Sequence, residues 1–270
     1  IKGGSLGGFL SFRSESLNEA QNALGRIAIN IAQTFNDQHQ LGIDLTGNMG
    51  ADFFSAPTPQ FFSSTLNDPA STIAVDISDV DQLTTSDYRF TYDGTNYILT
   101  RLSDNTSVST ATLPSAGSPL TIDGVQITNA TINPHERFLI QPTVNGAKNI
   151  SLNISDAAKI AAAAPVRTEA AVSNTGNATI SAGSINPLPL NPDLQQPITI
   201  AFHSPYDGQF DVTGTGAGLP ATNLVYTEGA DISFNGWTIQ IKGQPDAGDE
   251  FSVKPNTNGI ADNRNALLLA

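Results

Sequence analysis

The sequence predicts a mainly β protein with a long N-terminal helical segment, in an α+β, multidomain arrangement. Three observations predict this fold: helical periodicity near the N-terminus, short alternating stretches from about residue 71 onward, and an approximate repeat within those stretches. The chain has 270 residues, whereas a usual domain has about 100–200. We therefore expect two domains or three small ones rather than a single core.

The first element is an amphipathic helix that follows a glycine-rich start. Ser16 and Glu19 have the spacing of a capping box, in which a hydroxyl and a carboxylate satisfy free backbone N–H groups. The predicted helix ends near His39–Gln40, before the possible cap Leu41–Gly42. Its apolar residues recur at three- and four-residue steps, which predicts that they form a packing surface: Leu17, Ala20, Leu24, Ile27, Ala28, Ile31 and Phe35.

The apolar arc of this helix is unusually wide. With Ala23 and Ala32 it covers about half of the circumference, which is more than one partner helix would cover. Burying its five large side chains would contribute about 8–15 kcal/mol in all, at about 1.5–3 kcal/mol each. This face must therefore pack, either inside its own fold or against helices that lie outside this segment.

Strand patterns follow a loop that is rich in glycine and proline. Asp93–Gly94, Asp123–Gly124 and Asn145–Gly146 are typical of tight turns between strands. A short helix is predicted at 155–160, then an irregular connector at 166–196, before the strand pattern resumes at 198–202. The alternating stretches that predict the first set of antiparallel strands are 73–77, 88–92, 97–99, 120–122, 125–127, 138–140 and 150–154.

An internal repeat is the most informative feature of the organisation. Residues 120–127 match residues 232–239, and Phe138 matches Phe251. Glu136 then lies opposite Asp249. We interpret these matches as two copies of one β module of about 95 residues, a size at which each copy can have its own core.

These observations predict four segments along the chain. Residues 1–65 form a helical packing segment and loop, 66–165 the first β module, 166–258 the second, inserted β module, and 259–270 the start of a returning helix. The returning helix and terminal regions outside this sequence are expected to complete the helical part. The chain begins with Ile1 and its single methionine is Met49, so we expect a piece of a longer protein.

Composition excludes several classes of function. Lys and Arg number 12 against 25 Asp and Glu, for a net charge of -13, so no nucleic acid and no anionic membrane is expected as a partner. The chain has no cysteine, which excludes disulfides, thiolate metal sites and cysteine nucleophiles. No apolar stretch approaches the ~20 residues of a membrane span, and no signal peptide is evident.

Candidate metal sites are weak. The histidines His39, His135 and His203 lie in three separate predicted elements. Residues 44–48 begin like a calcium loop, but Met49 stands where glycine is needed and Ser55 where a bidentate glutamate is needed. A turn built on Asx side chains is therefore expected at Asp44, and no metal and no cofactor is predicted.

Catalytic and ligand-binding patterns are equally weak. The glycine-rich 214–218 lacks the spacing of a phosphate-binding loop and is expected to be a hairpin loop. The acidic pairs 76/79 and 246/249 lie in predicted loops, where solvated carboxylates are usual, and the alternating aromatics of 88–97 are typical of a hairpin core. No catalytic residue is assigned, so we expect a protein that is not an enzyme.

Several motifs resemble the hook-associated protein 1 family of bacterial flagella. They comprise 4–13, the helix with residues 22–25 and 35–39, and the loop segments 42–45 and 50–54. Shorter similarities lie at 86–101, 155–163 and 262–267, although in the family the last two stretches are commonly close in sequence. Within the loop, the residues that carry the resemblance are Asp44, Asp52, Phe53 and Phe54.

The resemblance implies a structural component that joins hook to filament. It would self-assemble through helical faces into a tubular array with outward β modules, and its partners would be copies of itself, the hook protein and the second junction protein. The resemblance also implies type III export without a cleaved signal peptide, contacts of the termini with the export machinery and a chaperone, and an extracellular location in the flagellum. The alternative is a secreted adhesin or carbohydrate-binding β module protein.

Overall fold

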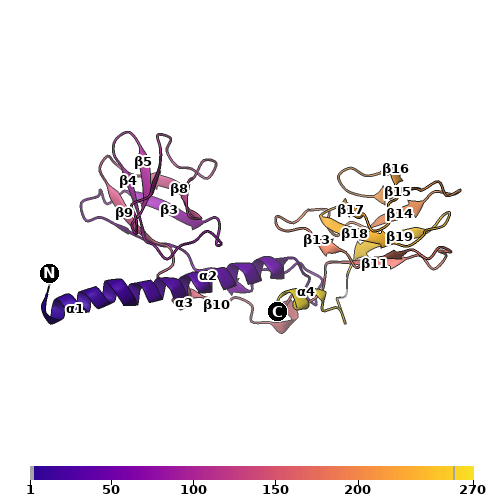
Figure 1. The fold of residues 1–270 in the computed structure, drawn as a ribbon, viewed down its shortest axis with the longest axis horizontal. Coiled ribbons are helices and arrows are strands. Elements are labelled where there is room, and N and C mark those ends of the chain that lie inside the picture. Colours follow the sequence, from indigo (N-terminus) through magenta and orange to yellow (C-terminus); the bar gives the residue numbers. More distant parts are fainter. Residues whose placement is uncertain (1–2, 258) are drawn as a thin grey trace. The chain divides into compact units, whose positions relative to one another are not determined.

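The computed structural model describes residues 3–257 and 259–270, and the chain is mainly β. It divides into two compact units, each with its own hydrophobic core (Figure 1). The first unit comprises Ile1–Thr34 and Phe54–Asn153, and the second comprises Phe35–Phe53 and Ile154–Ala270.

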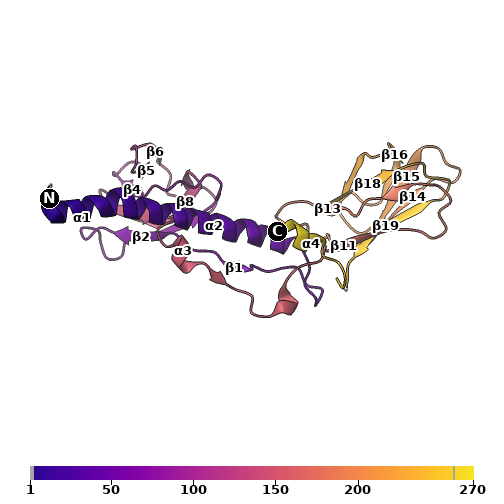
Figure 2. The same cartoon turned by 60° about the horizontal axis from the view of Figure 1, so that its bottom comes forward.

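The N-terminal helical segment consists of α1 (Gly4–Phe12), a π-helical turn (Arg13–Leu17) and α2 (Asn18–Gln40), which follow one another along one rod in Figure 2. Helix α2 ends where the sequence predicts, at Gln40. The predicted capping box at Ser16 is wrong because Ser16 lies inside the π-helical turn. A capping box stabilises free N–H groups at a helix end, and helical turns already precede this position.

The first unit contains two antiparallel sheets that together form β module 1. The larger sheet has the order β2-β9-β4-β5-β6, and the smaller has the order β3-β8-β7. Their core includes the alternating residues Tyr88 and Phe90 of β4, both fully buried, as the hairpin-core interpretation predicts. The strands are β2 (Gln60–Ser63), β3 (Thr72–Ile77), β4 (Tyr88–Tyr92), β5 (Tyr97–Arg101), β6 (Ser107–Thr110), β7 (Leu120–Ile122), β8 (Val125–Thr131) and β9 (Arg137–Gln141).

The second unit contains β module 2, also built from antiparallel strands. The larger sheet has the order β11-β19-β14-β15-β16, while β12, β13 and β17 all pair with β18. Trp237 is fully buried in its core. The strands are β11 (Val166–Ala170), β12 (Thr179–Ile180), β13 (Ser184–Ile185), β14 (Ile198–Phe202), β15 (Gln209–Gly214), β16 (Ala221–Val225), β17 (Asp231–Phe234), β18 (Trp237–Lys242) and β19 (Glu250–Pro255).

Two of the predicted tight turns form hairpins between consecutive strands. Asp123–Gly124 joins β7 to β8 with φ of 49° and 73°, and Gly94 takes a φ of 101° between β4 and β5. Asn145–Gly146 does not form a hairpin, because Gly146 begins the short helix α3 (Gly146–Asn149). Positive φ at both central residues is what a type I′ hairpin turn requires.

Other local predictions are corrected by the structure. The stretch 166–196 is not an irregular connector, since β11, β12 and β13 lie in it. The short helix expected at 155–160 is only a 3-10 turn, Ala157–Lys159. Strand β2 lies before residue 66, the predicted start of the first module. Its place in the module is decided by pairing with β9, which is distant in sequence. Two short elements complete the fold: β1 (Phe54–Ser55) paired with β10 (Ser151–Leu152), and α4 (Arg264–Leu268).

Candidate functional site: an exposed helix face

Helix α2 and the last residue of the preceding π-helical turn expose an apolar face rather than burying it. Leu17, Leu24, Ile27 and Ile31 are 52–59% exposed, and Ala20 is exposed beside them. The side chains recur at helical spacing, so they lie along one side of the helix. The structure therefore brings these predicted packing residues together as one continuous surface, which we call the apolar helix face.

A different side of α2 packs against the protein itself. The buried residues recur at three- and four-residue steps and are mostly small or polar: Asn22, Gly25, Ile29, Ala32, Asn36 and His39. Of the apolar residues predicted at this helix, Ala32 thus belongs to the buried side. The side that is buried is therefore not the apolar side. It consists of small and polar residues because α2 comes close to the backbone of its own chain there.

Hydrogen bonds and a close backbone contact explain this polar packing. The Nδ2 of Asn22 donates to the Thr85 carbonyl over 2.9 Å, and a guanidinium nitrogen of Arg26 donates to the Leu83 carbonyl over 3.2 Å. A Cβ on Gly25 would collide with the backbone of Thr143. Only glycine permits this approach, so the helix docks on module 1 without using its apolar face.

The energy that remains available on this face is large. Complete burial of a Leu or Ile side chain contributes about 1.5–3 kcal/mol, and about half of each side chain is still exposed here. Covering the four residues would therefore contribute about 3–6 kcal/mol. Such a contribution is a substantial fraction of the net stability of a domain, about 5–15 kcal/mol.

Helix α1 extends the exposed apolar surface beyond the predicted helix. Leu6, Phe9, Leu10 and Phe12 are 46–73% exposed. The sequence did not predict these residues as part of a helix, because the four glycines at the start are typical of a loop. Their spacing of three and four residues was the signal that could have identified them.

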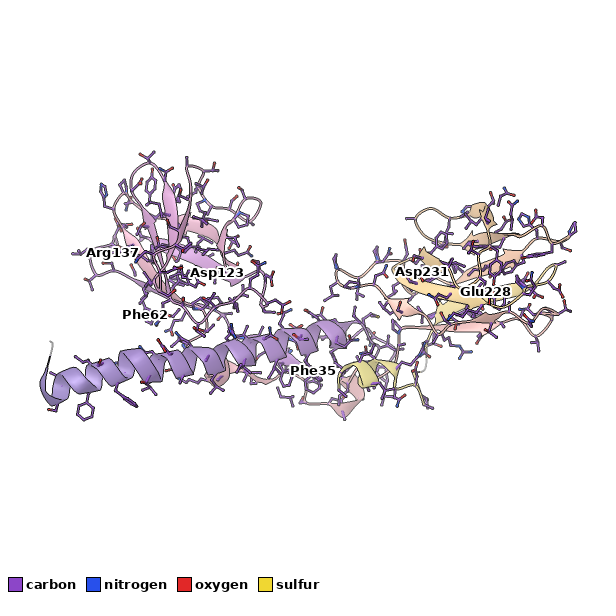
Figure 3. The ribbon with its side chains drawn as sticks, viewed as in Figure 1. Phe35, Phe62, Asp123, Arg137, Glu228 and Asp231 are labelled. Carbon is purple, nitrogen blue, oxygen red and sulfur yellow. The ribbon has the colours of Figure 1, made fainter. Side chains whose placement is uncertain are left out.

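Phe35 differs from the other predicted packing residues. Its ring lies 4.8 Å from that of Phe53, which in turn lies 5.5 Å from His39. Phe35 and Ala28 are only partly exposed. Phe35, which Figure 3 labels near the end of α2, thus joins the helix to the loop that follows it rather than contributing only to the apolar helix face.

Behind Phe53, His39 is fully buried and uses both of its ring nitrogens. Nδ1 lies 2.6 Å from the Ala51 carbonyl, and Nε2 accepts the Ala161 N–H over 2.9 Å. These partners fix the neutral tautomer, with the proton on Nδ1. Asn265 of α4 donates to the Ala161 carbonyl over 2.6 Å. We call this group of residues, namely Phe35, His39, Phe53, Ala161 and Asn265, the His39 cluster.

The remaining loop residues have structural partners. Asp44 is 4% exposed, and its Oδ1 accepts hydrogen bonds from the backbone N–H groups of Thr46 and Asn48, which confirms the predicted Asx turn. Burial alone would raise the pKa of Asp44, but these hydrogen bonds, with that of the Thr46 hydroxyl, lower it. Asp52 accepts a hydrogen bond from Gln40, and Phe54 pairs with Leu152 in the β1–β10 ladder.

In the acidic pair at 246/249, Asp246 is exposed as expected, whereas Asp249 is buried, contrary to expectation. Asp249 is 2% exposed. Its carboxylate accepts hydrogen bonds from the backbone N–H groups of Thr175, Gly176 and Asp246 over 2.9, 3.2 and 2.9 Å. Glu136 of module 1 is likewise buried and accepts the Ser71 hydroxyl over 2.6 Å. Each carboxylate sits just before the last strand of its module, where it holds neighbouring loops together.

Hydrogen bonds from the Ser71 hydroxyl and from the N–H groups of Asp68 and Asn133 lower the pKa of Glu136 to about 2. Ser71 makes the largest contribution. The carboxylate is therefore ionised throughout the physiological range. Its role in the fold is that of a hydrogen-bond acceptor, as expected for a buried anion surrounded by donors.

The other candidate sites stay apart or serve as loops. His203 lies between the carboxylates of Asp207 and Asp211 at 3.0 and 3.1 Å, and His135 lies in the other unit. The glycine-rich 214–218 lies at the end of β15 and in the loop that leads to β16, as predicted.

Within 3–257 and 259–270, no group of three or more His, Cys, Asp or Glu side chains could hold a metal ion. No helix among these residues has the length and apolar character needed to cross a membrane.

Comparisons with known proteins find similarity to flagellar hook-associated protein 1. Residues 1–54 match the model of the helical domain of flagellar hook-associated protein FlgK, and residues 62–142 match that of a D2-like domain of flagellar hook-associated protein 1. Flagellar hook-associated protein 1 of Salmonella typhimurium is 38% identical over 162 residues, and that of Escherichia coli is 34% identical over 161 residues. Each alignment covers 59% of this chain and 29% of the relative.

A solved structure matches nearly the whole chain. The flagellar hook junction protein FlgK from Burkholderia pseudomallei superposes with a TM-score of 0.73 at 31% identity, covering 99% of this chain and 53% of that protein. The chain thus spans about three-tenths of the length of the curated relatives and about half of that of the Burkholderia protein. At 99% coverage, the match includes both β modules.

Proposed function

The chain belongs to the flagellar hook-associated protein 1 family, and on this premise we propose that it is part of a structural component of the bacterial flagellum that joins hook to filament. The observation that supports this most is the apolar helix face, which α2 leaves open although its burial is strongly favourable. The residues proposed for packing are Leu17, Ala20, Leu24, Ile27, Ala28, Ile31 and Phe35. Helices of the assembled protein would cover this face.

The mechanism is mechanical rather than enzymatic. Apolar helix faces hold copies of the protein in a tubular array, and the β modules project outward into solvent. The proposed neighbours are other copies, the hook protein and the second junction protein. Export by the flagellar type III apparatus, through contacts of the chain's termini with that machinery and its chaperone, places the protein outside the cell. The absence of cysteine suits a chain that assembles there without disulfides.

Substitution of Leu24 by Asp tests this function in the full-length protein. Leu24 is 59% exposed, so the change should cost the folded chain little, but it would bury a carboxylate in the helix contact. We expect loss of junction assembly and of swimming. The matched control is Asn18→Asp, which adds the same charge at an exposed polar position outside the apolar arc. Motile cells that carry Leu24→Asp would refute the proposal.

We further propose that the two β modules are copies of one module, as the sequence repeat predicts. Three features support this: the larger sheets share one order of strands, the turns Asp123–Gly124 and Asn235–Gly236 both have positive φ, and Glu136 and Asp249 each precede the last strand. The proposed segments remain a helical part (1–65), the first module (66–165), the inserted module (166–258) and the returning helix (259–270), with β2 added to the first module.

Excision of the second module tests its independence from assembly. Residues 166–255 can be removed because Pro165 and Asn256 are adjacent, with the Asn256 N–H donating to the Pro165 carbonyl over 2.9 Å. If the module serves a surface function rather than assembly, cells with the shortened protein should swim normally. Loss of swimming, with the shortened protein still exported and folded, would count against that role.

A further inference from the structure

The outer face of the larger sheet of module 1 carries an apolar and basic patch. In the pairing register, Phe62 lies beside Leu139, which lies beside Arg89 on the other side. Arg137 follows on the same face, as a diagonal neighbour of Arg89 at about 7–8 Å between backbones. Phe62 is 45% and Leu139 37% exposed, and both arginines are exposed. We call these four residues the module 1 patch; Figure 3 labels Phe62 and Arg137 on it.

The two arginines of the patch form no ion pair with any residue that the structure describes. Ion pairs among the described residues involve Arg101, Lys159, Arg167, Lys254 and Arg264, together with His203, but neither Arg89 nor Arg137. The two positive charges lie on the same face of the sheet and repel each other. In a chain of net charge -13, this pair of uncompensated cations beside an exposed phenylalanine therefore requires a reason other than folding.

Module 2 shows that the fold itself does not require the patch. Its strands at the same places in the sheet order carry the row Glu169, Ser252 and Thr199. Arg137 corresponds in register to Glu250, which pairs with Ala201. The large apolar side chains and both arginines are thus replaced by small polar and acidic residues in a sheet with the same order of strands.

Module 2 has instead a hollow of complementary character. A cavity of about 290 Å³ opens between β16 and β17, the two strands at the free edges of its sheets. The side chains that line it include Phe210, Leu224, Val225, Tyr226, Phe234 and Asp231. Val225 is 76% exposed, so this apolar side chain of the lining faces solvent.

Two carboxylates give the hollow a negative rim. Asp231 lines it and accepts the Gln240 side-chain amide over 2.9 Å. Glu228 lies three residues earlier and accepts the Gly243 N–H over 3.0 Å. No ion pair among the described residues includes either carboxylate. The Tyr226 hydroxyl, whose side chain lines the hollow, donates to the Gly243 carbonyl over 2.6 Å, so Glu228 lies beside this part of the lining.

We propose that the module 1 patch of one copy docks onto the acid-rimmed hollow of module 2 of a second copy. Phe62 and Leu139 cover the apolar lining, while Arg89 and Arg137 face Glu228 and Asp231. Aromatic and arginine side chains against an apolar pocket are the combination that contributes most at protein interfaces. The two surfaces differ, so the contact is heterologous and propagates from copy to copy. This inference rests on the proposed function, which places copies beside one another.

Cysteine cross-linking in the full-length protein tests the contact, because this chain has no cysteine of its own. One copy carries Thr91→Cys, beside Arg137 in the register, and the other carries Ser233→Cys in the hollow. Co-expressed, they should give a disulfide-linked dimer that neither variant gives alone. The control pair is Ala201→Cys, at the matching place in module 2 beside Glu250, with Ser233→Cys; its yield should be at least about tenfold lower, as expected for a site outside the contact.

Charge reversal provides the second arm. Arg89→Glu with Arg137→Glu should lower the cross-link yield about tenfold or more, since like charges that face each other across an interface oppose association. Glu228→Lys with Asp231→Lys in the other copy should restore it. An unchanged yield after reversal would overturn the proposal. A cross-link within a single chain carrying both cysteines, in dilute solution, would also overturn it.

Immunolabelling of the hook–filament junction separates the two levels of inference. If the unsubstituted protein is absent from the junction, the proposed function fails. If the protein is present there and no dimer forms, the docking contact fails while the proposed function stands.

Discussion

Substitution of His39 by Leu should make the His39 cluster open more often without unfolding β module 2. Leu has a similar size and is apolar, so contact with the Phe53 ring is largely kept. Both hydrogen bonds of the imidazole are lost, however: the one to the Ala51 carbonyl and the one from the Ala161 N–H. The substitution therefore isolates the polar contribution of His39.

The expected magnitude follows from these two partners. A buried donor or acceptor that loses its partner costs about 1–3 kcal/mol, so two such groups cost about 2–4 kcal/mol after partial access of water. At 1.36 kcal/mol per factor of ten, opening of the His39 cluster becomes roughly 30- to 1,000-fold more frequent. The Ala161 amide, which donates directly to His39, should report this opening.

Hydrogen exchange of the Ala161 amide is the measurement. In His39→Leu its exchange should accelerate by the factor above, whereas the fluorescence of Trp237, the single tryptophan, should not change because module 2 stays folded. His39→Gln, which can both donate and accept, should restore part of the protection. If the Ala161 amide of His39→Leu exchanged within about threefold of the unsubstituted chain, the assigned role of His39 would be wrong.

Three further predictions concern the rest of the chain. Gly25→Ala should lower the free energy of unfolding of the first unit by about 1–3 kcal/mol despite the better helix propensity of alanine, because its Cβ meets the Thr143 backbone; urea denaturation measures this, and an unchanged midpoint would contradict the close contact. The Glu136 carboxylate, whose pKa is lowered to about 2 from 4.5, should stabilise the fold above pH 4.5 and lose this effect as pH falls towards about 2; Glu136→Gln should flatten the melting temperature in this window. Hydrogen bonding to Asp207, the largest cause, raises the pKa of His203 above 6.5. The small contribution of His203 to the stability of the fold is therefore full below pH 6.5 and is lost as pH rises through the raised pKa. If the melting temperature of His203→Gln depended on pH in the same way as that of the unsubstituted chain, this role of His203 would be wrong.

Local sequence patterns were sufficient wherever neighbouring residues decide the structure. The end of α2 at Gln40, the hairpin at Asp123–Gly124 and the Asx turn at Asp44 all depend on groups within a few residues. The same is true of the alternating aromatics of β4, whose inward side chains are fully buried. Such features follow from backbone sterics and side-chain spacing alone.

The sequence was less informative where distant segments meet. Strand β6, Ser107–Thr110, has no apolar alternation, and its place is decided by pairing with β5. The burial of Asp249 depends on N–H groups about 70 residues earlier in the chain. The extent of the N-terminal helical segment was also underestimated, because its glycines outweighed the spacing of its apolar residues.

The candidate site itself divides in the same way. The apolar side chains from Leu17 to Phe35 and their helical spacing were evident from the sequence, as was the conclusion that this surface needs a partner. Their exposure was not, since amphipathic helices usually bury the apolar side in their own fold. Tertiary structure decided it: Gly25 allows backbone contact and Asn22 supplies hydrogen bonds, so the polar and small side of α2 docks on module 1 and leaves the apolar helix face open.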